Sequence, residues 1–254
     1  MLPPLQRDQI DVVLVSPRNP LNIGAVARAM ANFGFDRLTV VAPYAPHWRE
    51  AKSAVGAPGL LKNARQVATL AEAVAACTLV AGTGTLTHRK PEQRVIQLPE
   101  LALPVSDSIA AAGRVALVFG PEKHGLTRED LSFCHLLVEI PTDARQPSMN
   151  LGQAAAVCLY ELAAHASQPL PTTPGPSPKT ISGTQTASGT LDRIATLIEE
   201  TSLAAGYSPR TMQDANRHDL RLLLRRLGPS ERDSRRILGF FRRVLRQLTH
   251  PPTR

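Results

Sequence analysis

The feature that most constrains the fold is a regular alternation, from Ile10 to about His165, of short apolar runs with segments of helical periodicity. Most of the apolar runs are continuous, as expected for strands that are buried on both faces. Strands separated by helices are typical of a parallel sheet covered by helices on both sides. The predicted strands are Val12–Val15, Leu38–Ala42, Leu79–Gly82, Val115–Gly120 and Leu136–Ile140.

Helical periodicity fills the intervals between these runs. The spacing of apolar residues predicts helices over 22–33, 70–76 and 150–164. A further helix is expected to open at Thr127, because Asp130 stands where a capping box needs an acidic residue. We therefore predict an α/β domain over residues 1–166.

Residues 167–190 differ in composition from the rest of the chain. They are rich in Pro, Gly, Ser and Thr and have almost no large apolar side chains, so burial cannot offset the entropy of ordering them. We predict a flexible linker here. Three helical patterns follow, over 191–203, 208–228 and 230–248. They predict a small helical module at residues 191–254 that the flexible linker connects to the first domain.

The positive charge is concentrated in that module. The chain has a formal net charge of +8, and residues 190–254 contain 13 arginines, no lysine and 7 acidic residues. Arginine suits nucleic-acid phosphates, so we predict RNA contacts along two helices, although a solvated face is the simpler alternative. The predicted RNA-binding residues are Arg217, Arg221, Arg225, Arg242 and Arg246.

Size and cysteine usage narrow the class of protein. With 254 residues, 43% of them hydrophobic, the chain can bury a core, yet no window approaches the roughly 20 apolar residues of a membrane span. Three cysteines without CxxC spacing support neither a disulfide framework nor a zinc site, so we predict no metal. Since no secretion signal opens the sequence, the expected location is the cytoplasm.

Polar clusters follow three of the predicted strands, at the edge where open α/β sheets bind ligands. The first, SPRNPLNIGAVAR at 16–28, contains Asn22 as the predicted helix cap and Gly24 as a point of close ligand approach. Arg28 follows nearly two turns later. The second cluster, FGPEKHGL at 119–126, holds Glu122 on a tight loop between two glycines.

The third cluster, IPTDARQPSMNLGQA at 140–154, places Ser148 and Asn150 just before a helix, where capping alone could explain them. Common nucleotide sites are not supported. The G-x4-G of 120–125 lacks the Lys-Ser/Thr of a phosphate loop, and Gly82-Thr83-Gly84 lacks the third glycine of a dinucleotide fingerprint. Without GxSxG, Ser148 is not supported as a hydrolase nucleophile.

Together, the three clusters resemble the SpoU/TrmH class of RNA 2′-O-ribose methyltransferases, most closely its TrmJ-like branch. The resemblance covers about residues 11–162, and GYSPR at 206–210 with the Arg-rich helices also resembles the tail of that branch. Small departures are Met149, where Leu is usual, and Gly152, where Ser or Ala is frequent. The resemblance to this class depends on three motifs: Asn22-Ile23-Gly24 with Arg28, Phe119-Gly120-Pro121-Glu122 with Gly125-Leu126, and Ile140-Pro141 with Ser148-Met149-Asn150-Leu151.

The resemblance implies a SPOUT fold, which is an α/β sheet whose C-terminal segment threads through a loop as a deep trefoil knot. It also implies S-adenosylmethionine as cofactor, a homodimer with an active site shared between subunits, and a tRNA substrate methylated at anticodon-loop position 32, on cytidine or uridine. The implied cofactor-binding residues are Thr83, Gly84, Thr85, Gly120, Ile140, Ser148, Met149, Asn150 and Leu151.

The resemblance makes Arg28 the proton acceptor of the reaction, while Asn22, Glu122, Ser148 and Asn150 position ribose, phosphate and cofactor. A guanidinium with a pKa above about 12 stays charged near neutrality. We therefore expect Arg28 to clamp an RNA phosphate and to stabilise the developing alkoxide, with a substrate phosphate as a possible acceptor.

Three other functions stay open at this point. The RNA could be a tRNA D-loop or a ribosomal RNA, since related enzymes with these motifs modify both. The protein could be a catalytically silent RNA-binding homodimer, although Asn22, Arg28 and Glu122 are all present. A nucleotide-dependent oxidoreductase is the third, and the incomplete glycine fingerprint counts against it.

Overall fold

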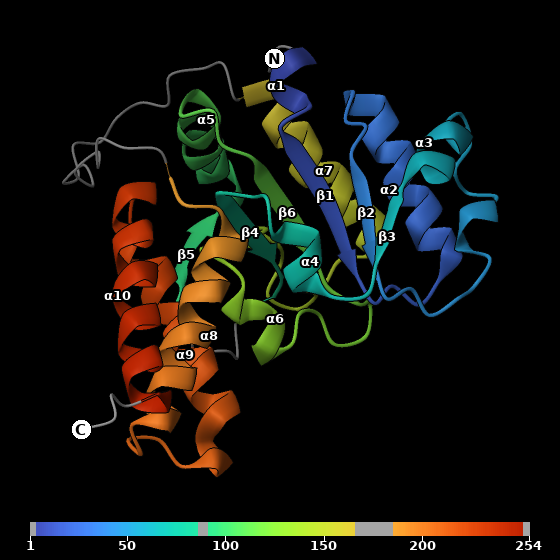
Figure 1. Ribbon diagram of the computed structural model, residues 1–254. Helices are drawn as coiled ribbons and strands as arrows, with labels where there is room; N and C mark the ends of the chain where they lie inside the picture. The colour runs from blue at the N-terminus through green and yellow to red at the C-terminus, as the bar shows by residue number, and fades with distance from the viewer. Residues whose placement is uncertain (1–3, 86–90, 166–184, 251–254) are drawn as a thin grey trace.

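The computed structural model describes residues 4–85, 91–165 and 185–250. Residues 167–184 of the predicted linker lie outside this range. One sheet of seven strands forms the centre of the molecule, in the order β3-β2-β1-β6-β4-β7-β5, and every pairing is parallel (Figure 1). The strands are β1 (Ile10–Val15), β2 (Leu38–Val41), β3 (Arg65–Val67), β4 (Leu79–Thr83), β5 (Arg94–Gln97), β6 (Val115–Phe119) and β7 (Leu136–Glu139).

The five predicted strands are all present, and the α/β fold with a parallel sheet is confirmed. Strands β3 and β5 were not predicted. Both lie at the edges of the sheet and are mostly exposed, so they lack the continuous apolar run that marks a central strand. The knot that the resemblance implies stays a prediction.

Ten α-helices accompany the strands in the described residues. The predicted helices are present, with ends shifted by a few residues, and α1, α3 and α5 were not predicted. The helices are α1 (Pro4–Arg7), α2 (Pro20–Phe33), α3 (Pro58–Asn63), α4 (Leu70–Val74), α5 (Ala102–Ala110), α6 (Arg128–Ser132), α7 (Leu151–His165), α8 (Ser188–Ala204), α9 (Gln213–Leu227) and α10 (Glu231–Thr249), with 3-10 turns at Trp48–Glu50, Leu98–Leu101 and Arg210–Met212.

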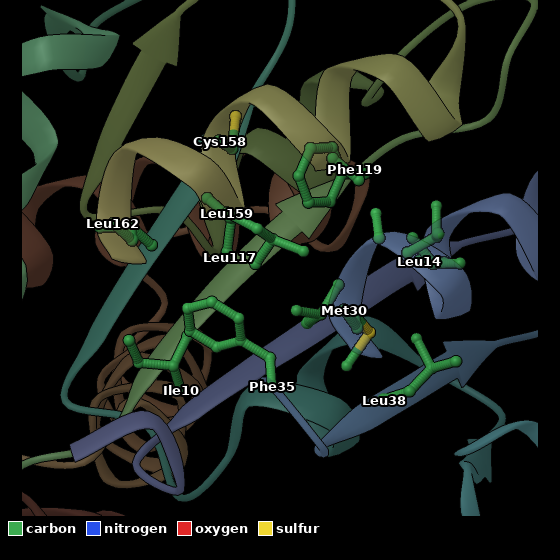
Figure 2. Close-up of a cluster of buried hydrophobic side chains, with 14 of the residues drawn as sticks. Ile10, Leu14, Met30, Phe35, Leu38, Leu117, Phe119, Cys158, Leu159 and Leu162 are labelled. Atoms are coloured by element: carbon green, nitrogen blue, oxygen red, sulfur yellow. The ribbon is translucent and has the colours of Figure 1, made fainter. Parts of the chain in front are cut away.

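Side chains that alternate along the strands build a core on each face of the sheet. Ile10 and Leu14 of β1 point to one face, where Leu159 of α7 and Met30 of α2 pack against them (Figure 2). Val13, on the opposite face, belongs to a second core formed with α4, α6 and the segments beside them. Helices therefore cover both faces, as the continuous apolar strands predicted.

The C-terminal helices α8, α9 and α10 stand together beside the sheet (Figure 1). They are not a detached module, because α8 packs on α4, and α9 on α6. The backbone of Ser188 donates to Cys77 O at 2.8 Å, and that of Gly189 to Ala75 O at 3.0 Å. Residues 185–190, the end of the predicted linker, are thus part of the docked structure, and α8 begins at Ser188.

Candidate active site

A cavity of about 520 Å³ opens at the carboxyl edge of the sheet, where the loops after β4, β6 and β7 meet. These loops are far apart in the sequence and converge because their strands are neighbours in the sheet, in the order β6-β4-β7. The predicted site residues that line the cavity are Thr83, Gly84, Thr85, Gly120, Glu122, Ile140, Ser148, Met149 and Leu151.

Two glycines shape the walls of the cavity. A Cβ atom on Gly120 would lie 2.9 Å from the Cα of Gly125, closer than packed atoms approach, so the tight loop closes only with glycine there. At Gly84 a Cβ would meet nothing within 4 Å. The Thr85 hydroxyl, from the loop after β4, donates to Pro147 O at 3.1 Å and ties the third loop to it, while the Thr142 hydroxyl donates to the same oxygen at 3.2 Å from within the third loop.

Three predicted side chains form a hydrogen-bonded chain beside the cavity. The Asn22 amide donates to Glu122 Oε1 at 2.8 Å, and Asn150 donates to Asn22 Oδ1 at 3.0 Å. Asn150 Oδ1 in turn accepts the backbone N–H of Gly152 at 2.9 Å and so caps α7. The first, second and third sequence clusters therefore meet through these three residues.

Glu122 is held ionised. Burial opposes the charge, but donors outweigh it: the Asn22 amide, the backbone N–H of Arg18 at 3.0 Å, its own N–H and that of Asn19 at 3.1 Å. The pKa of Glu122 is therefore below its ordinary value. Its carboxylate can orient Asn22 and attract a cation in the cavity.

Two details of the first cluster differ from prediction. The cap of α2 is Asn19, whose Oδ1 accepts Leu21 N at 2.9 Å, and not Asn22, which lies inside the helix. Pro20 explains the shift, since it fits the first turn of a helix. Gly24 does not face a ligand: a Cβ there would lie 2.9 Å from Ala54 N, so the glycine is required for packing against a loop of the same chain.

Arg28 lies apart from the cavity lining. Its side chain is exposed on α2, two turns beyond Asn22. Helix α2 packs closely on α7, because Gly152 allows the contact: a Cβ there would lie 2.7 Å from the Cβ of Ala25. The departure at Gly152 from the resembled pattern thus has a packing reason.

Sequence reasoning missed part of the cavity wall. Gln97 and Glu139 end β5 and β7 and are joined by a hydrogen bond of 3.1 Å. Glu139 is a charged residue directly after three apolar strand residues, and that break in the pattern was the available signal. The predicted strand ran on to Ile140 and so concealed it. Leu126 and Leu131 add apolar lining.

Two of the predicted arginines of α9 make contacts within the chain that attach this helix to its neighbours. Arg225 is buried and donates to Phe133 O at 3.0 Å and to Asp192 Oδ1 at 2.9 Å. Arg221 pairs with Glu129 and lies over the Phe133 ring, 4.2 Å from its centroid. These side chains dock α9 onto the α/β domain.

The other predicted RNA-binding arginines differ in exposure. Arg217 forms an ion pair of 2.8 Å with Glu199, which is itself buried. Arg242 and Arg246 are exposed on α10. RNA binding by the predicted arginines stays a prediction, and Arg242 and Arg246 are the two of the five whose side chains are exposed.

The described residues meet neither the requirement for a metal site built from three side chains nor that for a membrane-spanning helix. Over the described ranges, no three His, Cys, Asp or Glu side chains gather as the ligands of a metal would. Of the helices that the structure describes, none is long and apolar enough to cross a lipid bilayer.

Comparison with known proteins finds relatives among the tRNA 2′-O-methyltransferases. The TrmJ protein of Pseudomonas aeruginosa, a tRNA (cytidine/uridine/adenosine-2′-O-)-methyltransferase, is 42% identical over 61% of this chain, and the match spans only 60% of that relative's length. The tRNA (cytidine/uridine-2′-O-)-methyltransferase TrmJ of Pectobacterium atrosepticum is 31% identical over 96% of this chain and 98% of its own.

The fold has a solved counterpart. The crystal structure of TrmJ from Z. mobilis ZM4 superposes with a TM-score of 0.78 and 27% sequence identity, covering 92% of this chain and 98% of that one. The sequence profile of the SpoU rRNA Methylase family matches residues 9–160, which contain all three loop clusters. The chain therefore belongs to the SpoU rRNA methylase family.

Proposed function

We propose that this protein transfers a methyl group from S-adenosylmethionine to the 2′-hydroxyl of a ribose in tRNA, at anticodon-loop position 32. The observation that carries the proposal is the hydrogen-bonded chain Glu122–Asn22–Asn150, which joins three distant sequence clusters at the rim of one cavity. The TrmJ relatives, named as tRNA 2′-O-methyltransferases, support the choice of substrate.

The cavity suits the proposed cofactor. Its volume of about 520 Å³ lies within the roughly 300–1,000 Å³ of small-molecule sites. Leu126, Leu131 and Leu151 offer an apolar wall for an adenine ring, and the ionised Glu122 is complementary to a sulfonium. S-adenosylmethionine supplies an electrophilic methyl carbon when bound. We assign its binding to the nine residues that the resemblance implies, of which eight line the cavity and Asn150 lies at its rim.

Methyl transfer to a hydroxyl requires alignment of the 2′-oxygen with the methyl carbon and a route for the hydroxyl proton. In the proposed transfer the 2′-oxygen would bond to the methyl carbon that S-adenosylmethionine supplies, the C–S bond would break with its electron pair on sulfur, and the hydroxyl proton would leave. Asn22 and Asn150, held in place by Glu122, are suited to orient the ribose, with Ser148 beside them. Arg28, which stays charged, stabilises the developing alkoxide and binds phosphate, while a substrate phosphate accepts the proton.

Arg28 needs a second subunit to reach a cofactor. The two packed helices α2 and α7 expose apolar side chains: Leu21 of α2 is 55% exposed, and Val157 and Tyr160 of α7 are 38% and 53% exposed. Exposed apolar patches of this kind on packed helices favour protein contacts. We propose that two copies pair through α2 and α7, so that Arg28 of one serves the cavity of the other, in the cytoplasm where tRNA is modified.

The exposed arginines of α10, including Arg242 and Arg246, supply the proposed RNA surface. Their charge attracts the phosphate backbone through counterion release, which makes binding depend steeply on salt. We therefore propose that tRNA contacts α10, while α9 packs on α6 and holds the C-terminal helices to the α/β domain.

The test is methyl transfer from radiolabelled S-adenosylmethionine to unmodified tRNA, followed by mapping of the 2′-O-methyl position. Label at position 32 is the expected result. Label in the D-loop or in ribosomal RNA would change the substrate, and no label despite RNA binding would identify a silent RNA-binding protein. Calorimetry with S-adenosylmethionine and NAD side by side separates the proposal from an oxidoreductase.

Arg28→Lys tests the proposed role of the guanidinium. Loss of one charge-assisted hydrogen bond of roughly 1.5–3 kcal/mol predicts a rate at saturating tRNA that is about 10- to 150-fold lower. A nearly full rate would refute the bidentate clamp, since lysine keeps the charge without the fork.

A further inference from the structure

Tyr44 is exposed beside the active site with no part in the core. It lies three residues beyond the end of β2, and 75% of its surface is exposed. The loop that carries Tyr44 follows β2 at the carboxyl edge of the sheet, where open α/β sheets bind ligands, so the exposed ring is available to a ligand there. The guanidinium carbon of Arg18 lies 5.3 Å from the centre of the Tyr44 ring.

Hydrogen bonds connect the backbone of Tyr44 to the loop that carries Arg18, and that of Arg18 to the loop after β6, which carries Glu122. Tyr44 N donates to Pro17 O at 3.2 Å, which fixes the loop after β2 to the loop after β1. Arg18 N donates to Glu122 Oε2 at 3.0 Å. The backbone of Tyr44 is therefore linked, through the Pro17–Arg18 peptide, to the Glu122 carboxylate that lines the cavity.

The backbone that presents this pair is strained. Ser16 has φ 45° and Ala42 has φ 41°, and each is the first residue after its strand. In the stretches of chain that the structure covers, only one other non-glycine residue, Ala112, has a positive φ. A left-handed conformation is unfavourable for residues with a Cβ atom and is kept where the surroundings impose it, most often at functional sites. Two such residues side by side turn both loops at this edge.

We propose that Tyr44 and Arg18 form a stacking platform for an unpaired base of the RNA substrate, next to the nucleotide whose ribose enters the active site. The inference rests on the proposed RNA methyl transfer and extends it to the binding of the flanking nucleotide. The Tyr44 ring offers a π-face to a base, and Arg18, which keeps the ring in place, offers its charge to the adjoining phosphate.

Stacking predicts what the platform recognises. Every base has a π-face, so the platform favours an unstacked, single-stranded loop over a duplex without selecting a particular base. Tyr44 therefore contributes to RNA affinity and alignment rather than to the choice between cytidine and uridine.

The experiment compares Tyr44→Leu, which keeps apolar bulk without a ring, with Tyr44→Phe, which keeps the ring. Loss of one stacked base, measured elsewhere by alanine substitution, corresponds to roughly a 5- to 150-fold weaker interaction. We expect the KM for tRNA to rise by this factor in Tyr44→Leu, at nearly constant kcat, and Tyr44→Phe to recover most of the loss. The affinity for S-adenosylmethionine, measured by calorimetry, should not change.

Val55→Ala is the surface control, because Val55 is 64% exposed, is not among the residues that line the cavity and has no ring. Its KM should match that of the unmodified protein. Equal KM values for Tyr44→Leu and the unmodified protein would refute the platform while leaving the methyl transfer intact. If the unmodified protein binds S-adenosylmethionine but methylates no RNA, the proposed function itself fails, and the platform with it.

Discussion

The substitution Arg225→Ala tests whether this arginine of α9 attaches the helix to the α/β domain or binds RNA. The Arg225 side chain is 2% exposed, and its partner Asp192 is 18% exposed. The guanidinium also donates to Phe133 O and to Ser188 Oγ, at 3.0 and 3.2 Å. Alanine at position 225 would remove these hydrogen-bond donors. The Asp192 carboxylate and the Phe133 carbonyl would then lose their bonds to Arg225 in the interface between α9 and the α/β domain.

The expected destabilisation follows from that burial. Removing one partner of a buried ion pair costs about 3–5 kcal/mol, because the remaining charge loses its compensation. For a chain of this size each kcal/mol shifts the melting temperature by roughly 2–4 °C, which predicts a fall of roughly 6–20 °C. The salt dependence of tRNA binding should stay as it is, since a buried arginine contacts no phosphate.

The assay pairs a thermal melt with tRNA binding over a range of salt concentrations, below the melting temperature of the variant. Arg226→Ala is the matched control, since Arg226 is the next residue of the same helix and is exposed. Its melting temperature should change little. If Arg225→Ala melted like the unmodified protein and its salt slope fell by about one phosphate contact, the docking role would be refuted in favour of RNA binding.

Three other perturbations test the cavity. Gly120→Ala should abolish S-adenosylmethionine binding in calorimetry, because its Cβ would displace the loop at Gly125; retained affinity would contradict the packing argument. Gly152→Val should separate α7 from Ala25 and lower the rate of methyl transfer while the cavity still binds cofactor, as kinetics with saturating tRNA would show. The pKa of Glu122 in the folded protein lies below its ordinary value of 4.5. Ionised Glu122 therefore stabilises the folded state above pH 4.5, and this stabilisation is lost as the pH falls through the pKa of the folded state. Urea midpoints of Glu122→Gln should therefore vary less below about pH 4.5 than those of the unmodified protein.

The central strands could be predicted because burial on both faces requires uninterrupted apolar residues. Val115–Phe119 and the first three residues of Leu136–Glu139 satisfy this requirement, whereas Arg65–Val67 and Arg94–Gln97 are edge strands with polar, exposed residues. The end of α9 at Gly228, with φ 54°, and the cap of α10 at Ser230 were also predictable, since both depend on local backbone preferences.

The site was predictable only in part. The sequence by itself determined that three polar clusters follow buried strands, and the parallel order of those strands brings the clusters to one edge. Only the tertiary structure decided that Asn22 binds Glu122 instead of capping its helix, and that Gly24 faces the protein's own loop. These outcomes depend on contacts between segments about 30 to 100 residues apart, which local patterns do not contain.

For the arginines of α9, too, the sequence determined one property and the tertiary structure another. The sequence by itself determined their spacing of four residues on a helix, and therefore that they share a face. Whether that face meets solvent or protein was decided by the position of Phe133 and Glu129 on a different part of the chain. Charge patterning specifies a face, but burial, which depends on the packing of distant elements, determines what that face binds.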